Sequence, residues 1–255
     1  MSKSIAIFNQ KGGVGKTTTV VNLSACLSSL GKKVLMIDID PQGNTTSGVG
    51  IDKSKLKYSI YDMLINDIPP ADCVLPTSLK GLYIIPASVQ LAGAEIELTG
   101  YNQRELKLRE CIIDLEDKYD FIFVDCPPSL GLLSINALSA VDSVLIPIQC
   151  EYYALEGVSQ LMNTYSLVKE NLNEALEIEG VVLSMFDGRT NLSIQVVDEV
   201  KKYFKGKVYT TVIPRNVRLA EAPSHGMSII EYDPRSKGAE AYMDLAEEFI
   251  YLSEE

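Results

Sequence analysis

The sequence lacks several features that would assign it to a specialised class of protein. No apolar run approaches the roughly 20 residues that cross a bilayer, and the N-terminus has no long apolar segment of the kind found in signal peptides. The five cysteines are scattered and are never spaced as C-x-x-C, which argues against a zinc site or a disulfide framework. We therefore expect a cytosolic protein with free thiols.

Histidine and positive charge are also scarce. The single histidine, His225, lies in the turn-like segment EAPSHG without identifiable partners, so we expect a structural or solvated side chain. The 23 lysines and arginines face 34 acidic residues, which gives a net charge of −11. This balance argues against a protein that coats nucleic acid over its whole surface, although it allows a local basic face.

The sequence does contain short aliphatic runs that alternate with longer helical patterns. This alternation predicts an α/β fold with a doubly wound, mostly parallel sheet flanked by helices. With 255 residues and no repeat or linker, we expect a single domain over residues 1–255. Helices are expected over Thr17–Leu30, ended by Gly31, and over Ala154–Leu172. The expected strands are Ser4–Phe8, Lys33–Asp38, Leu82–Pro86, Phe121–Asp125, Ser143–Pro147, Glu179–Ser184 and Lys207–Ile213.

A glycine-rich segment, NQKGGVGKTTT, lies between the first expected strand and the first expected helix. The N–H groups of such a turn and the positive end of the helix form an anion site. In a phosphate-binding loop, Lys16 would contact the β and γ phosphates and the Thr17 hydroxyl would coordinate Mg²⁺. The general motif requires glycine where this chain has Gln10, so the loop is a variant, and Lys11 is a second lysine that the general motif does not explain.

Acidic residues follow two of the expected strands. Asp38 and Asp40 lie in MIDIDPQGN, at the sheet edge where ligands bind in such folds. Asp and Gly also form ordinary turns, and the phosphate loop is what favours a chemical role here. Asp125 ends the apolar strand in YDFIFVDCPPSLG, which is the usual position of the acid that holds Mg²⁺ in P-loop enzymes.

With these elements in order, the sequence resembles the ParA/MinD family of P-loop ATPases, whose deviant Walker A motif reads K-G-G-x-G-K-[ST]. Within this family it resembles the chromosomal ParA proteins called Soj, through segments such as QLAGAEIEL, RTNLSIQVVDEVKKYF and VIPRNVRLAEAPSHG. The resemblance implies that Lys11 reaches the nucleotide of a second subunit, so that an ATP-dependent homodimer encloses two ATP molecules. It also implies that Asp40 orients the attacking water.

The resemblance further implies a complete set of site residues, with ATP and Mg²⁺ as cofactors and weak intrinsic ATP hydrolysis as the activity. Catalysis would depend on Lys11, Lys16 and Asp40. Mg²⁺ would be held by Thr17, Asp40 and Asp125. The implied nucleotide-binding residues are Lys11, Gly12, Gly13, Val14, Gly15, Lys16, Thr17, Thr18, Pro214 and Asn216, the last two against the adenine.

Basic residues gather late in the chain. Between Arg189 and Arg218, seven basic residues face two acidic ones, a net charge of +5, whereas residues 231–255 carry −6. By composition alone such a cluster is solvated surface charge. The resemblance instead favours nonspecific DNA binding, because the ATP-bound dimers of ParA proteins bind DNA. Arg189, Lys201 and Arg218 are the expected DNA contacts, and Arg215 is expected nearer the nucleotide.

The implied function is chromosome or plasmid partitioning on the nucleoid in the cytoplasm. A ParB-type centromere-binding protein would stimulate hydrolysis and release the dimer from DNA. Only three residues precede the first strand, so we expect no N-terminal helix-turn-helix domain. The acidic tail GAEAYMDLAEEFIYLSEE opposes binding to anionic lipids and thus a MinD-like membrane function. The alternative left open is a MinD-like or other nucleotide-gated regulator that binds a protein partner and has no DNA function.

Overall fold

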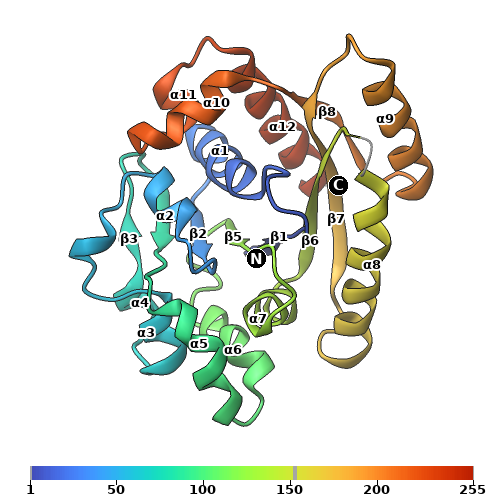
Figure 1. Ribbon diagram of the computed structural model, residues 1–255. Helices are drawn as coiled ribbons and strands as arrows, with labels where there is room; N and C mark the ends of the chain where they lie inside the picture. Colours follow the sequence, from blue (N-terminus) through green and yellow to red (C-terminus); the bar gives the residue numbers. More distant parts are fainter. Residues whose placement is uncertain (1, 152–153, 255) are drawn as a thin grey trace.

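The computed structural model describes residues 2–151 and 154–254, and within them eight strands form one sheet (Figure 1). The order is β3-β4-β2-β5-β1-β6-β7-β8, and only β3 pairs in an antiparallel manner. Strands β2 to β5 lie on one side of β1, and β6 to β8 lie on the other. This arrangement confirms the predicted doubly wound, mostly parallel sheet. The strands are β1 Lys3–Ile7, β2 Val34–Asp38, β3 Leu75–Pro76, β4 Leu82–Ile85, β5 Phe121–Asp125, β6 Ser143–Gln149, β7 Glu177–Phe186 and β8 Val208–Pro214.

Helices cover both faces of this sheet. In Figure 1, α1, α11 and α12 lie on one side, and α3, α5, α6 and α7 lie on the other. The helices are α1 Lys16–Ser29, α2 Asn44–Gly48, α3 Ile60–Ile65, α4 Pro70–Cys73, α5 Leu91–Glu97, α6 Lys107–Ile113, α7 Leu132–Ala140, α8 Ala154–Asn171, α9 Asn191–Tyr203, α10 Val217–Glu221, α11 Ile229–Tyr232 and α12 Lys237–Glu254.

The strands are buried on both faces, as their nearly uninterrupted apolar sequences predict. In β5, Phe121 and Phe123 point toward α12, where their rings lie 5.2 and 5.8 Å from that of Phe249. Ile122 and Val124 point to the opposite core, which α6 and α7 cover. This alternation follows from the two-residue period of a strand.

The predicted element boundaries differ from the structure by one or two residues at most ends. The range of β5 is as predicted, and β6 and β7 extend beyond their predicted ends to Gln149 and Phe186. Gly31 has a φ of +88°, in agreement with its predicted role at the end of α1. Strand β3 is absent from the prediction, because two edge residues, one of them proline, carry no pattern that a sequence reveals.

The apolar face of α12 is part of the core. Tyr242, Leu245 and Phe249 are at most 1% exposed and belong to the cluster that also contains residues of α1 and β8. These three residues of α12 are therefore part of the packed core. No helix in the described part of the chain has the length and apolar character needed to cross a membrane.

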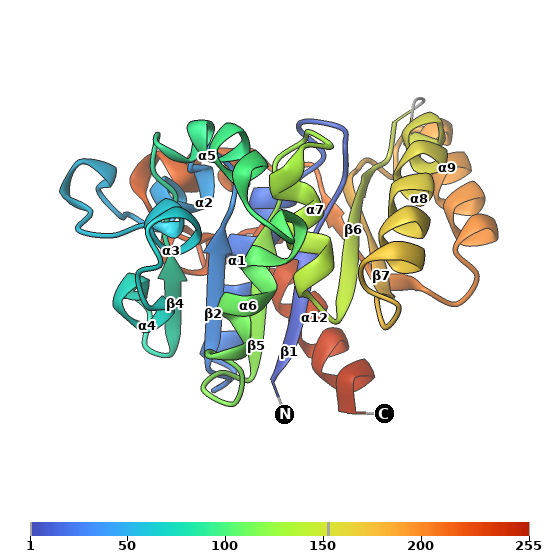
Figure 2. The same ribbon diagram turned by 90° about the horizontal axis from the view of Figure 1, so that it is seen from below.

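The parallel strands bring their carboxyl ends to one edge of the sheet. The register aligns Ile7 of β1 and Asp38 of β2 with Asp125 of β5, which lies between them. In Figure 2, β2 and β4 both point toward this edge. The loops that follow β1, β2 and β5 therefore meet there, as the sequence predicts for a ligand site.

A close backbone contact joins the segment after α2 to the segment before α11. Gly50 and Gly226 both have positive φ, and a Cβ on Gly226 would lie 2.6 Å from the Gly50 Cα. Gly31 offers a comparison, because it also has positive φ but a Cβ there would meet nothing within 4 Å.

We predict that Gly226→Ala lowers the free energy of unfolding clearly more than Gly31→Ala does. Both changes place alanine in the left-handed region, at a cost of about 1–2 kcal/mol. Only Gly226→Ala also forces a methyl group into the backbone of Gly50. Urea unfolding followed by circular dichroism measures both variants, and equal losses would contradict the prediction.

Candidate nucleotide-binding site

The loop between β1 and α1 has the backbone of an anion cradle. Gly13 has a φ of +75°, and Gly15, which precedes the first residue of α1, has a φ of +96°. Glycine adopts this conformation without the steric cost that a side chain would add. The first N–H groups of α1 have no carbonyl partner within the helix, so they are available to a negatively charged ligand.

The side chains of Asn9 and Ser184 join this loop to strands that are distant along the chain. The Asn9 side chain donates to the Pro147 carbonyl at 2.8 Å and accepts from the Lys11 N–H at 3.0 Å. The Ser184 hydroxyl donates to the Val14 carbonyl at 2.7 Å. The contacts with Pro147 and Val14 join positions 138 and 170 residues apart. Because these contacts are so distant along the chain, no local motif indicates the roles of Asn9 and Ser184.

The two lysines of the loop differ in their surroundings. Lys16 is only 7% exposed, and within the described residues its Nζ donates one hydrogen bond, to the Lys11 carbonyl at 3.2 Å. Burial lowers the pKa of Lys16, and the nearby carboxylates of Asp125 and Asp40 oppose that shift. An ammonium group has three protons to donate, so Lys16 retains donors for a phosphate. Lys11 is half-buried at the start of the loop.

Thr17 and Asp125 form the part of the site that fits a magnesium ion. The Thr17 hydroxyl donates to Asp125 Oδ2 at 2.8 Å, which leaves the lone pairs of the hydroxyl oxygen for a cation. Asp125 Oδ1 is buried without a hydrogen-bond partner among the described residues. Mg²⁺ prefers such oxygens and commonly takes further ligands from phosphates and water. Among the described residues, no group of three or more His, Cys, Asp or Glu side chains could hold a metal ion. A magnesium ion here would thus need phosphate or water as further ligands.

The loop after β2 places its two acids differently. Asp38 is fully buried, and its Oδ2 accepts from both the N–H and the hydroxyl of Thr46, at 2.8 and 2.6 Å. Asp40 is 8% exposed, and its Oδ1 accepts from the Gln42 N–H at 2.9 Å. Asp38 therefore holds α2 in place, whereas Asp40 is close enough to Lys16 for its carboxylate to oppose the lowering of that lysine's pKa by burial.

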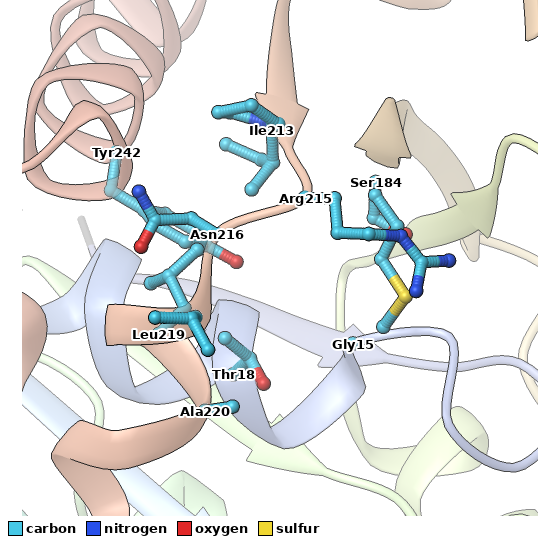
Figure 3. Close-up of a pocket in the computed structure, with 12 residues that line it drawn as sticks. Gly15, Thr18, Ser184, Ile213, Arg215, Asn216, Leu219, Ala220 and Tyr242 are labelled. Atoms are coloured by element: carbon cyan, nitrogen blue, oxygen red, sulfur yellow. The ribbon is translucent and has the colours of Figure 1, made fainter. Parts of the chain in front are cut away.

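A pocket of about 550 Å³ opens beside Gly15 and Thr18. Figure 3 shows Tyr242 of α12 on one side of it, Arg215 and Ser184 on the other, and Ile213 at the end of β8. The volume is in the range of small-ligand sites. The complete lining is Gly15, Thr18, Ser184, Met185, Ile213, Pro214, Arg215, Asn216, Val217, Leu219, Ala220 and Tyr242.

The predicted adenine residues, Pro214 and Asn216, both line this pocket, and their contact with a base stays a prediction. Asn216 Oδ1 accepts from the Arg218 N–H at 2.8 Å and so caps α10. The NH₂ group of Asn216 can donate hydrogen bonds to a base. Arg215 also lines the pocket, and its guanidinium pairs with Glu151 at 3.0 Å.

Other parts of the pocket wall are missing from the sequence prediction. Tyr242 lies far along the chain from the predicted base segment, and its hydroxyl is 3.2 Å from that of Thr19. Met185 has a φ of +52°, a strained conformation for a residue with a side chain. Leu219 and Ile213 have the character of ordinary core residues. Ile213 and Leu219 lie in the segment that carries Pro214 and Asn216, but apolar residues of this kind give no signal that separates a pocket wall from the core.

The structure does not gather the three predicted DNA contacts on one element. Arg189 precedes α9, and Lys201 lies about 15 Å along the helix from its first residue, Asn191. Arg218 lies on α10, which Figure 1 shows away from α9. Arg189 pairs with Asp187 at 2.6 Å, and Arg218 pairs with Glu221 at 2.8 Å. Lys201 is exposed. Their role in DNA binding stays a prediction.

The histidine and the cysteines agree with their structural interpretation. His225 is exposed and its ring stacks on that of Tyr232, with centroids 4.9 Å apart. All five cysteines are free thiols, and four of them are buried. Burial raises the pKa of Cys150 to about 11, so this thiol stays protonated at neutral pH.

Taken together, the fold and the loop after β1 define a nucleotide-binding protein of the P-loop class. A family model described as an AAA domain matches residues 2–178. The chain is 62% identical to the sporulation initiation inhibitor protein Soj of Bacillus subtilis (strain 168), over 97% of this chain and 98% of that protein. It is 52% identical to the chromosome partitioning protein ParA of Myxococcus xanthus, over 98% of this chain and 88% of that protein.

A solved structure has the same fold. The cobyrinic acid a,c-diamide synthase from Mycobacterium smegmatis, with bound ADP and magnesium, matches with a TM-score of 0.87 and 35% identity, over 100% of this chain and 96% of that chain. The chain belongs to the AAA-domain family and, within it, to the ParA/MinD group of deviant Walker A ATPases, among the ParA and Soj proteins. The resemblance inferred from the motifs is thus confirmed.

The two buried acids give the site a dependence on pH. Burial raises the pKa of Asp38, and the neighbouring Asp125 raises it further. At this one carboxyl, the folded protein thus binds more protons than the unfolded chain from near pH 3.8, the ordinary value, toward neutral pH. Stability falls with rising pH wherever the folded state binds more protons. Asp38 therefore contributes a loss of stability as the pH rises through this window.

We predict that Asp38→Asn, measured without nucleotide, becomes more stable relative to the natural protein as the pH rises from about 5 to about 8. The asparagine side chain cannot ionise, so the variant lacks this loss. Asp52→Asn is the control, because hydrogen bonds from Ser54 and Lys55 hold the pKa of Asp52 at about 2 and both states are ionised in this range. Urea unfolding across the series tests the prediction, and a constant difference for Asp38→Asn would contradict it.

Proposed function

We propose that this protein is a ParA/Soj-type partitioning ATPase in which bound ATP controls a homodimer and, through it, binding to DNA. The observation that carries the proposal is the cradle around Thr17. Three features meet there. They are the glycine loop, the buried Lys16 with unused N–H donors, and the Asp125 carboxylate, whose Oδ1 has no partner among the described residues. The chromosome-partitioning relatives and the ADP and magnesium of the M. smegmatis structure support the same ligands.

In this proposal the backbone of residues 12–18 and the Lys16 ammonium bind the phosphates of ATP. Thr17, Asp125 and Asp40 hold Mg²⁺, which neutralises phosphate charge when bound. Asp40 orients the attacking water and accepts its proton. Its carboxylate is suited to this role because the Gln42 N–H fixes one oxygen and burial limits the movement of the side chain.

Lys11 supplies the dependence on a second subunit. Its backbone carbonyl, and not its side chain, contacts Lys16 in the described structure, so the side chain is available to a neighbour. A cation delivered across an interface stabilises phosphate charge only when the two subunits close, as an arginine finger does. Hydrolysis within an isolated subunit would therefore be weak, and ATP would favour the homodimer.

DNA binding would follow from dimerisation. The basic residues near α9 and α10 are dispersed, and Arg189, Lys202 and Arg218 each pair with a carboxylate on the same segment. One copy would thus bind DNA weakly, and two copies in a dimer would double the phosphate contacts. A ParB-type partner would then stimulate hydrolysis and release the dimer. The proposed place of action is the nucleoid in the cytoplasm.

We predict that Lys16→Ala and Lys11→Ala separate nucleotide binding from dimerisation. Lys16→Ala should weaken ATP binding about 10- to 100-fold, because it removes a charged hydrogen bond to phosphate. Lys11→Ala keeps the carbonyl that accepts from Lys16, so the monomer should bind ATP normally but fail to dimerise. Fluorescent ATP analogues and light scattering measure the two steps. If Lys11→Ala weakened ATP binding as much as Lys16→Ala, the role of Lys11 across the interface would be disproved.

We also predict that Arg189→Ala, Lys201→Ala and Arg218→Ala weaken retention on random-sequence DNA in the presence of ATP, with dimerisation unchanged. Removing one phosphate-binding cation should lower the slope of log affinity against log salt by about 1. Arg235→Ala, in the acidic segment, is the matched control and should behave as the natural protein does. If the natural protein dimerises with ATP but ignores DNA even at low salt, a nucleotide-gated regulator of a protein partner becomes the better function.

A further inference from the structure

Two adjacent threonines at the start of α2 contact two different strand-end carboxylates. Thr45 donates from its hydroxyl to Asp125 Oδ2 at 2.6 Å, and Thr46 donates to Asp38 Oδ2 at 2.6 Å. Both threonines are 0% exposed. Helix α2 follows the Asp40 loop and packs against β2, near which it lies in Figure 1. It therefore joins the end of β2 to the end of β5.

The Thr45 contact determines how the Asp125 carboxylate is presented. Oδ2 accepts from Thr45 and also from Thr17, at 2.8 Å, whereas the buried Oδ1 has no partner among the described residues. Two hydroxyl donors on one oxygen fix the rotation of the carboxylate group. One oxygen is thereby committed to holding Thr17, and the other is left for a cation or for water bound to one.

The hydrogen bonds of Thr46 have different partners from those of Thr45. Its N–H and hydroxyl both donate to Asp38, and its hydroxyl oxygen accepts from the Ala87 N–H at 2.9 Å, in the segment after β4. These bonds connect α2 to the end of β2 and to the segment after β4, and none of them involves Asp125 or Thr17. Thr46 has the same side chain, burial and helix as Thr45, which makes it a matched comparison for any effect of Thr45.

We propose that Thr45 is a positioning residue for the nucleotide-bound cation: its hydroxyl fixes Asp125 so that Thr17 presents its oxygen lone pairs and Asp125 presents Oδ1. This inference rests on the proposed function, because it assumes that Thr17 and Asp125 hold Mg²⁺. It adds a residue that lies outside the phosphate loop and is not itself one of the predicted metal ligands. It also links the cation to α2, and so to the Asp40 loop.

A purely structural role for Thr45 predicts a different result from a positioning role. If Thr45 only satisfied a buried carboxylate, its loss would lower stability, and the dependence of nucleotide binding on Mg²⁺ would not change. If it positions the cation ligands, its loss should weaken Mg²⁺ binding about 10- to 100-fold, as for other residues that orient metal ligands. Nucleotide binding in the absence of Mg²⁺ should then stay as in the natural protein.

The experiment measures binding of a fluorescent ADP analogue to the full chain, in EDTA and across a series of Mg²⁺ concentrations. ADP avoids turnover and the ATP-dependent dimer. Thr45→Val should raise the Mg²⁺ concentration for half-maximal strengthening of ADP binding by about 10- to 100-fold. Thr45→Ser, which keeps the hydroxyl, should restore it, and Thr46→Val should leave it unchanged. Thr45→Ala serves in place of Thr45→Val if the valine methyl against the carboxylate prevents folding.

The outcomes separate this inference from the function on which it rests. If ADP binding to the natural protein does not respond to Mg²⁺, the proposed metal site fails, and the role of Thr45 fails with it. If the natural protein responds and the Thr45 variants respond equally, only the role of Thr45 is overturned. A shift for Thr46→Val as large as that for Thr45→Val would likewise overturn it, because the effect would then belong to α2 as a whole.

Discussion

Two carboxylates buried side by side, at the ends of neighbouring strands, constrain the rest of this structure. Asp38 and Asp125 are in register and fully buried, and burying unpaired charge costs several kcal/mol per group. The protein offsets this with hydroxyl donors from Thr17, Thr45 and Thr46, and with the ammonium of Lys16 nearby. Helices α1 and α2 must therefore both begin over this edge of the sheet. The glycine loop and the Asp40 turn are the connections that allow it.

The sequence predicted the strand, the glycine turn and the helix that carry the proposed phosphate site, because these elements are local. Strand, glycine turn and helix are consecutive, and the spacing alone places Lys16 and Thr17. Asp125 could also be singled out from the sequence, because an acid at the end of a long apolar run is unusual. The doubly wound fold followed from the same alternation of strands and helices. The boundaries differ by a residue or two because hydrogen bonds, and not hydrophobicity, decide where a strand ends.

The remainder of the site could not be predicted, because it depends on contacts between distant segments. Asn9 and Ser184 reach across more than half of the chain to hold the loop. The sequence gives only a weak indication of the roles of Thr45 and Thr46. Two buried strand-end acids need hydrogen-bond donors, and a Thr-Thr pair follows shortly after one of these acids. The dispersion of the basic residues was also hidden, because a charge count along the chain does not show that Asp187 and Glu221 pair with Arg189 and Arg218.

Helix α12 combines two tasks, since Tyr242 both fills the core and closes the pocket beside Thr18. The chain is made from its N-terminus at about 5–20 residues per second, so the phosphate loop leaves the ribosome long before this wall does. During most of synthesis the glycine loop has no enclosed pocket beside it, and the strand-end acids lack their complete core. The pocket beside Thr18 is therefore complete only after α12 has been made and has docked on the sheet.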